Sequence, residues 1–226
     1  MQATVQKLVD ERSPSYLVET PVVYNGALDD ISQKSDIRLI LVGDNPGRRE
    51  QAAENRRYLV GPSGKIAEKF FRDNPTLGID FRKNVIILNK TPIHTPRTVE
   101  LRELCKIGGN SQRTALVEAL AESQRFMARL LAEFQQAFAG EVTPTALPVW
   151  ITGYSEMKKG GAFEVYTNEL KNIYGKSTAP KDTVFLYRHF SMNQFTIDLK
   201  RQTLPGESLS KALRRIGTAY RQRFLS

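Results

Sequence analysis

Cysteine and histidine are the scarcest chemically reactive residues in this sequence: Cys105 is the one cysteine, and His94 and His189 are the two histidines. A single thiol excludes a disulfide within the chain, a four-thiolate zinc site and an iron–sulfur cluster held by this chain alone. With so few imidazoles, a histidine-rich metal centre is not expected either. We therefore predict a protein with no metal and no other cofactor.

Long apolar runs are missing as well. No stretch of eighteen apolar residues occurs, so the sequence predicts no membrane-spanning helix. The first residues include Asp10 and Glu11 and lack an apolar run followed by a small-residue cleavage site. We expect a cytoplasmic protein without a membrane partner.

Acidic residues are in the minority: 24 Asp and Glu stand against 33 Lys and Arg, a formal net charge of +9. Residues 1–36 are acidic on balance, whereas residues 200–226 hold seven basic residues and one acidic residue. This balance favours a polyanionic partner, and nucleic acid is our first expectation, although charge alone does not distinguish it from other anions.

What the 226 residues do contain is a regular alternation of apolar runs and helical patterns. Continuous apolar runs that end in turn residues are typical of strands covered on both faces; they span 37–42, 84–88, 148–151 and 182–187. Helical patterns are expected at 64–71, 116–138, 163–174 and 208–224, the last of them basic. The alternation predicts an α/β fold, a three-layer α/β/α sandwich around a four-stranded, mainly parallel sheet.

Residues 1–36 are expected to form an irregular N-terminal arm, and residues 37–226 a single domain. The helix over 116–138 is expected to bury one apolar face, which holds Leu116, Leu120, Phe126, Leu130, Leu131, Phe134 and Phe138.

Polar residues follow three of the predicted strands. Gly43-Asp44-Asn45-Pro46-Gly47 comes after the first strand, Asn89 ends the second, and His189 follows the fourth. Because ligands of open parallel sheets bind beyond the carboxyl ends of the strands, we expect these side chains to meet at one edge.

In these segments the chain resembles the uracil-DNA glycosylase superfamily. Gly43-Asp44-Asn45-Pro46-Gly47 is similar to its first motif, and Asn89 matches its base-reading asparagine. The segment from Tyr58 to Gly64 resembles the Pro-Phe-Val-Gly-x-x-Gly segment of the iron–sulfur branch. His189-Phe190-Ser191-Met192-Asn193 resembles the family's His-Pro-Ser motif, and the resemblance spans roughly residues 37–200 in the family's order.

The resemblance implies a fold like that of the family and a DNA glycosylase that hydrolyses the N-glycosidic bond of uracil or a related deaminated base. Breaking this bond develops positive charge on the sugar and negative charge on the base, so catalysis is largely electrostatic. The Asn45 carbonyl is suited to orient water, with Asp44 as an assisting carboxylate. His189 is suited to donate to the leaving base, and Asn89 to pair with uracil but not cytosine.

The remaining site residues are expected to contact the substrate or its strand. Substrate contacts are expected from Gly43, Pro46, Gly47, Tyr58 and Leu59. Because a base inside a duplex cannot reach such a pocket, it must be flipped out or single-stranded. Contacts to the DNA strand are expected from Gly61, Ser63, Gly64, Lys65, Ser191, Met192 and Asn193, with Met192 as the apolar wedge. We expect a monomer whose partner is DNA, and His94 as a loop residue that contacts phosphate.

Three departures from the family pattern keep other interpretations open. Leu59, beside Tyr58, stands where relatives have a stacking aromatic; Phe190 replaces a proline, and the four cluster cysteines are absent. Taken alone, the Gly-Asp-Asn-Pro-Gly segment is also typical of a tight turn. The alternatives are a glycosylase-like module that binds single-stranded or damaged nucleic acid without cleaving it, and a hydrolase of a small phosphorylated or nucleoside substrate.

Overall fold

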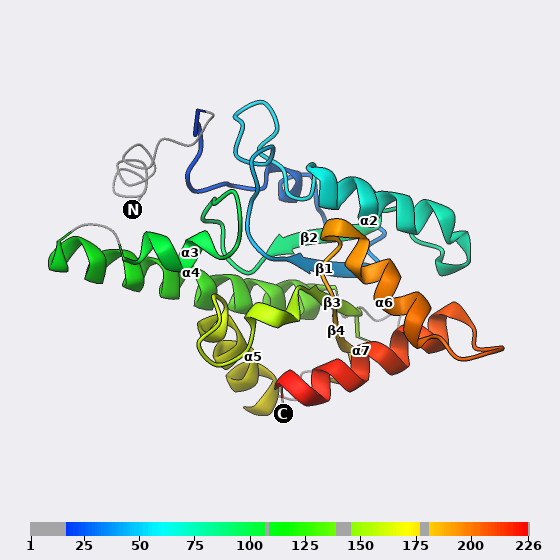
Figure 1. Ribbon diagram of the computed structural model, residues 1–226. Coiled ribbons are helices and arrows are strands. Elements are labelled where there is room, and N and C mark those ends of the chain that lie inside the picture. The colour runs from blue at the N-terminus through cyan, green and yellow to red at the C-terminus, as the bar shows by residue number, and fades with distance from the viewer. Residues whose placement is uncertain (1–16, 107–108, 139–145, 177–180, 226) are drawn as a thin grey trace.

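Four parallel strands form the centre of the computed structural model, which describes residues 17–106, 109–138, 146–176 and 181–225. They are β1 (Leu39–Gly43), β2 (Val85–Asn89), β3 (Val149–Thr152) and β4 (Val184–Tyr187), in the order β2-β1-β3-β4 (Figure 1). Every residue of these strands is buried, as their continuous apolar sequences predict. The predicted α/β fold is confirmed, and the sheet is parallel throughout.

Helices occupy most of the remaining described chain. The α-helices are α2 (Pro62–Asp73), α3 (Glu100–Leu104), α4 (Asn110–Ala137), α5 (Glu164–Lys176), α6 (Gln194–Gln202) and α7 (Leu209–Leu225). Short 3₁₀ turns are η1 (Gly26–Leu28), η2 (Pro75–Leu77), η3 (Tyr154–Glu156), η4 (Lys181–Thr183) and η5 (Ser191–Asn193). Among the described helices, none has the length and apolar character needed to cross a membrane.

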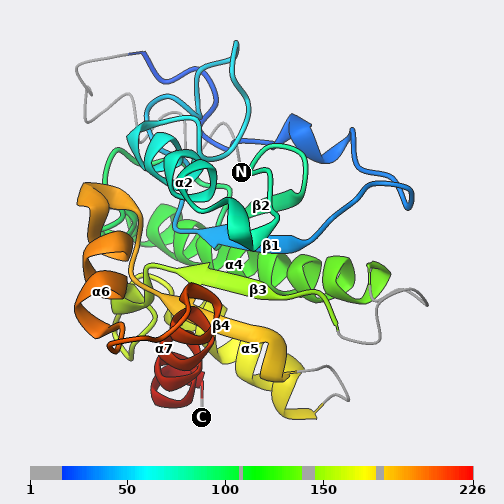
Figure 2. The ribbon, with the colours of Figure 1, turned by 90° about the vertical axis from the view of Figure 1, so that its right-hand side faces the viewer.

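The sheet lies between two helical layers (Figure 2). On one face, Trp150 of β3 stacks on Phe71 of α2 and on Phe195 of α6, with ring centroids 5.5 and 5.9 Å apart. Helix α7 crosses β4 on the same face at Gly217, where a Cβ would lie 2.6 Å from the Tyr187 hydroxyl. Helices α4 and α5 pack together on the other face, which completes the three-layer sandwich.

One prediction for the long helix is wrong. Phe126 of α4 is 55% exposed, although we expected it on the apolar face. Gln124 is buried in its place, because its side-chain amide donates to the Ala162 carbonyl and its carbonyl accepts from the Tyr166 N–H. A polar residue with both groups satisfied is cheap to bury, and apolar periodicity alone cannot identify such a residue.

The N-terminal arm follows the outer edge of β2. Within the described residues 17–36, the arm is irregular apart from η1 and an isolated bridge between Val22 and Ile93. Asn25 is buried and donates from Nδ2 to the Ile87 carbonyl at 2.8 Å. The Val23 N–H donates to the Pro92 carbonyl, also at 2.8 Å. Residues 1–16 of the predicted arm lie outside the described residues.

Candidate active site

The carboxyl ends of β1 and β2 meet at one edge of the sheet, where Gly43 pairs with Asn89. After β2 the chain crosses to the other side of β1 to form β3, and ligands of open parallel sheets bind at such a reversal. A cleft of about 640 Å³ lies at this edge. Its lining includes Asn45, Asn89 and His189, so the structure brings the three predicted amide and imidazole side chains to one cavity.

Asn45 has a fixed orientation in the cleft wall. Its Nδ2 donates to the Thr95 hydroxyl at 2.9 Å and to the Thr95 carbonyl at 3.2 Å. Its Oδ1 accepts from the Thr98 hydroxyl at 3.0 Å. A carbonyl oxygen has two lone pairs, so Oδ1 retains one acceptor position that is available to a water.

Asp44 also lines the cleft, and its carboxylate is bound on the inner side. The Lys90 ammonium lies 2.6 Å from Oδ1, and the Thr98 hydroxyl lies 3.4 Å from Oδ2. Gly153, directly after β3, adopts φ 78°, and a Cβ there would lie 2.2 Å from Asp44 Oδ1. Glycine at this position therefore leaves the space in which the carboxylate sits.

Lys90 is a component of the site that sequence reasoning missed. Its side chain is fully buried, where its ammonium donates to the carbonyls of Gly43 and Thr152 and lies 4.9 Å from the Phe163 ring centroid. Burial lowers the pKa of Lys90, and the charge of Asp44 opposes that shift. The only signal in the sequence was its place directly after Asn89, at the end of a strand.

The protonation of His189 is set by its own turn. Its Nδ1 accepts the backbone N–H of Ser191 at 3.0 Å, which leaves the proton of the neutral ring on Nε2. Burial lowers the pKa of His189; the charge of Asp44 raises it and that of Lys90 lowers it further. The imidazole is therefore a neutral donor that lines the cleft.

Phe190 keeps a backbone conformation in this turn that a proline could also adopt. Its φ of −69° is close to the value a proline ring imposes. Its ring is buried and stacks on the ring of Phe195, with the two ring centroids 4.3 Å apart. The centroid of the Phe70 ring of α2 lies 6.2 Å away. Aromatic packing thus fixes the backbone next to His189.

Asn89 presents an amide that has no side-chain hydrogen bond to the part of the chain that the structure describes. Its side chain is 3% exposed, yet it lines the cleft and forms no side-chain hydrogen bond to any described residue. A Cβ on Gly43 would lie 2.5 Å from Asn89 Oδ1, so glycine in the neighbouring strand leaves room for this side chain. A buried amide that lacks an acceptor or donor is costly unless a ligand or water completes it.

Leu59 forms part of the cleft wall in an unusual backbone conformation. Its φ is 53°, which is uncommon for a bulky residue. Two neighbours hold it: Arg82 donates from Nη2 to the Leu59 carbonyl at 2.9 Å, and Gly64 packs directly beneath that carbonyl. A Cβ on Gly64 would lie 1.6 Å from the Leu59 oxygen, so Gly64 has a packing role.

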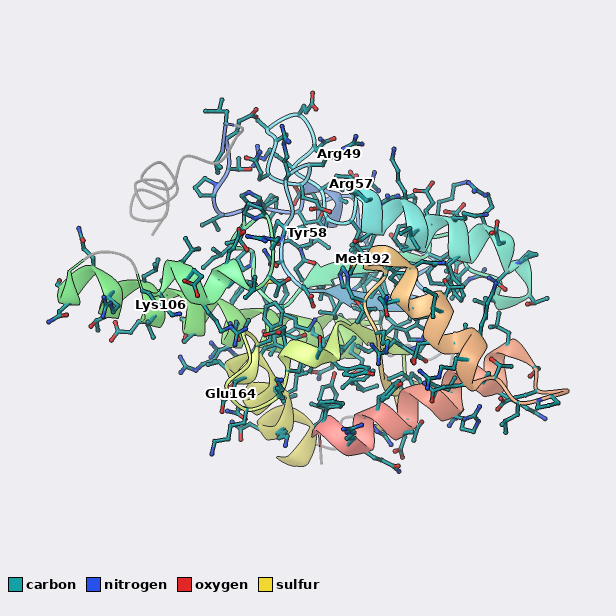
Figure 3. All side chains as sticks on the ribbon, in the orientation of Figure 1. Arg49, Arg57, Tyr58, Lys106, Glu164 and Met192 are labelled. Carbon is teal, nitrogen blue, oxygen red and sulfur yellow. The ribbon has the colours of Figure 1, made fainter. Side chains whose placement is uncertain are left out.

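The expectation that Tyr58 contacts the substrate is wrong. Tyr58 is 2% exposed, and its hydroxyl donates to the Val23 carbonyl of the arm at 2.9 Å (Figure 3). Because Leu59 adopts a left-handed conformation, consecutive side chains diverge, and Leu59 alone faces the cleft.

Glu50 is a second residue that sequence reasoning missed. It is buried in the cleft wall and accepts the backbone N–H groups of Gly47 and Gly61, the latter at 3.4 Å. Burial raises the pKa of the Glu50 carboxyl, and these backbone donors oppose that shift. Both glycines line the cleft, where we expected Gly47 to contact substrate and Gly61 the DNA strand, but their N–H groups are directed to the Glu50 carboxylate.

Three of the residues that we predicted to contact the DNA strand also line the cleft: Ser63, Ser191 and Met192. Met192 is 80% exposed, with φ 50°, and lies in the turn before α6, beside α2 (Figure 3). Met192 is therefore an exposed apolar side chain at the cleft.

Other predicted contacts lie outside the cleft lining. Gly43, Pro46 and Gly64 are buried behind it, so their contribution is to the shape of the wall. Lys65 and Asn193 are exposed beyond its margin.

His94 is buried, so the expectation that it contacts phosphate is wrong. It is 1% exposed, and its Nδ1 lies 2.7 Å from the Pro46 carbonyl, to which it donates. Burial lowers the pKa of His94, which favours the neutral ring. His94 therefore holds the loop that carries Asn45.

Comparison with protein-family models gives no match to this chain, and comparison with curated proteins gives none either. Among the described residues, no group of three or more His, Cys, Asp or Glu side chains is arranged to hold a metal ion.

Proposed function

We propose that this protein is a DNA glycosylase that hydrolyses the N-glycosidic bond of uracil or a related deaminated base, flipped into the cleft at the carboxyl ends of the strands. The observation that carries the proposal is that Asn45, Asn89 and His189, from three distant segments, line one cavity of about 640 Å³.

His189 and Asn89 would act on the base. As the glycosidic bond breaks, negative charge grows on the base carbonyl, and the neutral His189 donates Nε2–H to it. Asn89, whose amide has no partner among the described residues, pairs with the N–H and adjacent carbonyl of uracil. Cytosine presents the opposite polarity there and would leave buried groups unpaired.

Asn45 and Asp44 would act on the sugar side. The free lone pair of Asn45 Oδ1 orients the attacking water, because its amide and second lone pair are already held. The Asp44 carboxylate, fixed by Lys90, places negative charge near the sugar as positive charge develops there. Lys90 is a positioning residue in this scheme.

The arginines that line the cleft would hold the DNA strand. Arg48, Arg49 and Arg97 line the same cleft, and contacts of this kind bind phosphates without reading sequence. Met192 would fill the gap that the flipped base leaves in the stack.

The test is incubation with labelled oligonucleotides that carry uracil in single strands, U·G or U·A pairs, followed by alkaline strand cleavage. We expect cleavage at the uracil, reduced about 10²–10³-fold in His189→Ala because the donor to the leaving base is lost. Glu118→Gln, an exposed change on α4, serves as the control and should keep the parent rate. Absence of cleavage on all three substrates, and on hypoxanthine and xanthine, would refute the proposal.

A module that binds without turnover is the second candidate, and Leu59 favours it, because an aliphatic side chain stacks less well on a base than an aromatic one. It predicts oligonucleotide binding that survives both Asn45→Ala and His189→Ala, with no cleavage by the parent chain.

A further inference from the structure

A second cavity, of about 140 Å³, lies at the outer edge of β2 and shares no lining residue with the cleft. It is enclosed by the arm, by Arg57 and Tyr58, and by the loop before β2. Val85 and Ile87 of β2 contribute apolar side chains to its lining. One water needs about 10–15 Å³ of such space, so the cavity has room for more than a single water.

The lining of this cavity is positively charged. Three cationic side chains, Arg57, Arg82 and Lys83, line it together with one carboxylate, Asp30. Basic groups usually spread over a protein surface, where water screens them, and their collection in one hollow concentrates positive potential.

Two of these cations have buried N–H groups that find no acceptor among the described residues. Arg57 Nε and Arg82 Nη1 are shielded from solvent and have no hydrogen-bond partner among the described residues. The other two nitrogens of the Arg82 guanidinium donate hydrogen bonds: Nη2 donates to the Leu59 carbonyl, and Nε donates to the Glu68 carboxylate at 3.3 Å. Arg57 makes no hydrogen bond or ion pair to any described residue.

Such an arrangement is costly without a ligand. A buried donor that lacks an acceptor loses its hydration and gains nothing in exchange, and the loss is larger for a charged group. The two guanidinium groups also repel each other: burial lowers the pKa of Arg82, and the charge of Arg57 lowers it further against the opposing effect of Glu68.

We propose that this cavity is a binding site for a phosphate-type oxyanion, held by Arg57 and Arg82. A tetrahedral anion supplies several acceptors at once, and the guanidinium fork is the side-chain geometry best suited to it. One bound anion completes both N–H groups and removes the repulsion between the two cations. The same chemistry is offered by free phosphate and by the phosphate of a nucleic-acid strand.

Calorimetric titration of the full chain with inorganic phosphate, at constant ionic strength set with chloride, tests the proposal. We expect saturable binding that weakens at least about tenfold in Arg57→Gln, because a hydrogen bond to a charged group is lost. Arg49→Gln reports any binding in the cleft, which Arg49 lines; Arg214→Gln, an exposed change on α7 outside both linings, is the matched control. It should bind phosphate as the parent does.

The stability of Arg57→Gln gives a second readout with a distinctive sign. Without phosphate, we expect this variant to melt at a higher temperature than the parent, because an unpartnered guanidinium has been removed; with phosphate, the order should reverse. Loss of binding in Arg49→Gln but not in Arg57→Gln would place the anion in the cleft and overturn the proposal. Equal binding in the parent and in Arg57→Gln, or none in the parent, would also overturn it.

A uracil-free oligonucleotide distinguishes the two sources. Failure to displace phosphate from the parent chain identifies a free or small-molecule phosphate as the ligand, which we expect because the cavity and the cleft have separate linings. Displacement identifies a strand phosphate. Neither measurement requires glycosylase activity, so failure of the proposed function leaves this test intact.

Discussion

His189 and its neighbours illustrate how single side chains acquire their chemistry from tertiary contacts. The Ser191 N–H occupies Nδ1, and burial disfavours the charged ring. Both effects act toward the same state, a neutral imidazole with its proton on Nε2.

The lowered pKa of His189 has a consequence for stability. As the pH falls below the ordinary histidine value of about 6.5, the unfolded chain takes up the proton first, so folding stability is lost down to the lower pKa of the folded chain. In His189→Asn this contribution is absent. We expect the difference in free energy of unfolding between the two chains to change as the pH is lowered from about 7.5 to about 5.5, with the parent losing more. Urea unfolding measures it, and a constant difference would contradict the assignment.

The Lys90–Asp44 pair provides a second prediction at this scale. An exposed pair with the same 2.6 Å separation, Lys69–Asp73 on α2, serves as its control. We expect Lys90→Met to lower the free energy of unfolding by about 3 kcal/mol, because it leaves a largely buried carboxylate unpaired. Lys69→Met should cost less than about 1 kcal/mol.

A double variant completes this comparison. Lys90→Met combined with Asp44→Asn should recover much of the loss, since neither partner then carries a charge. Additive losses in urea unfolding would show that the two side chains are not coupled.

The candidate site was predictable where a polar residue comes soon after an apolar run that forms a strand. Asn45, Asn89 and His189 stand directly after apolar runs, and a parallel sheet brings such positions to one edge. Lys90 also follows a strand, but nothing local reveals that its ammonium turns inward. Tyr58 was misplaced for a similar reason, because the left-handed backbone of Leu59 depends on packing against α2.

At the scale of elements, the start of α2 supports the cleft wall. Pro62 begins the helix, where its missing N–H leaves no helical hydrogen bond unmade. Gly64 lacks a Cβ, so the Leu59 carbonyl can pass closely over the first turn. The helix and the cleft wall therefore form one packed unit.

Gly64→Ala tests this coupling. A methyl group would overlap the Leu59 carbonyl, and since the obstacle is backbone, we expect a loss of at least about 3 kcal/mol in the free energy of unfolding. Gly175→Ala in α5 is the control: outside its own helix backbone, no atom of the described residues lies within 4 Å of its added Cβ, and alanine should stabilise the helix by about 0.5–1 kcal/mol. Thermal or urea unfolding measures both, and equal effects would contradict the packing role of Gly64.

The strands and four longer helices were predictable from periodicity, because their burial follows from continuous apolar runs or one apolar stripe. The ends differ: α4 begins at Asn110, six residues earlier than predicted, in a segment whose first turns are exposed. Helices α3 and α6 were not predicted. The first is five residues long, and the second has only Phe195 and Leu199 fully buried, so neither shows a strong pattern.

At the scale of the whole molecule, the net charge of +9 supplies the sequence-independent part of any nucleic-acid affinity. The structure locates three arginines on the cleft, whereas basic side chains such as Arg214 of α7 are exposed elsewhere. Only the first group is expected to release counterions from a strand bound in the cleft.

This difference predicts unequal salt dependence. In fluorescence anisotropy with a single-stranded oligonucleotide, Arg49→Gln should make the slope of log K against log salt shallower by about 0.7, the value for one phosphate contact. Arg214→Gln should leave the slope unchanged. A larger effect from Arg214→Gln would place the strand on α7.

The arm that runs along β2 also covers an edge of the described sheet. In the described sheet β2 has a strand on one side only, and Asn25 and Val23 occupy hydrogen-bonding groups along its other side and just beyond its end. A version shortened to begin after residue 36 would present that strand as an open template, on which identical molecules can add edge to edge. We therefore expect a chain without the arm to aggregate more readily than the full chain.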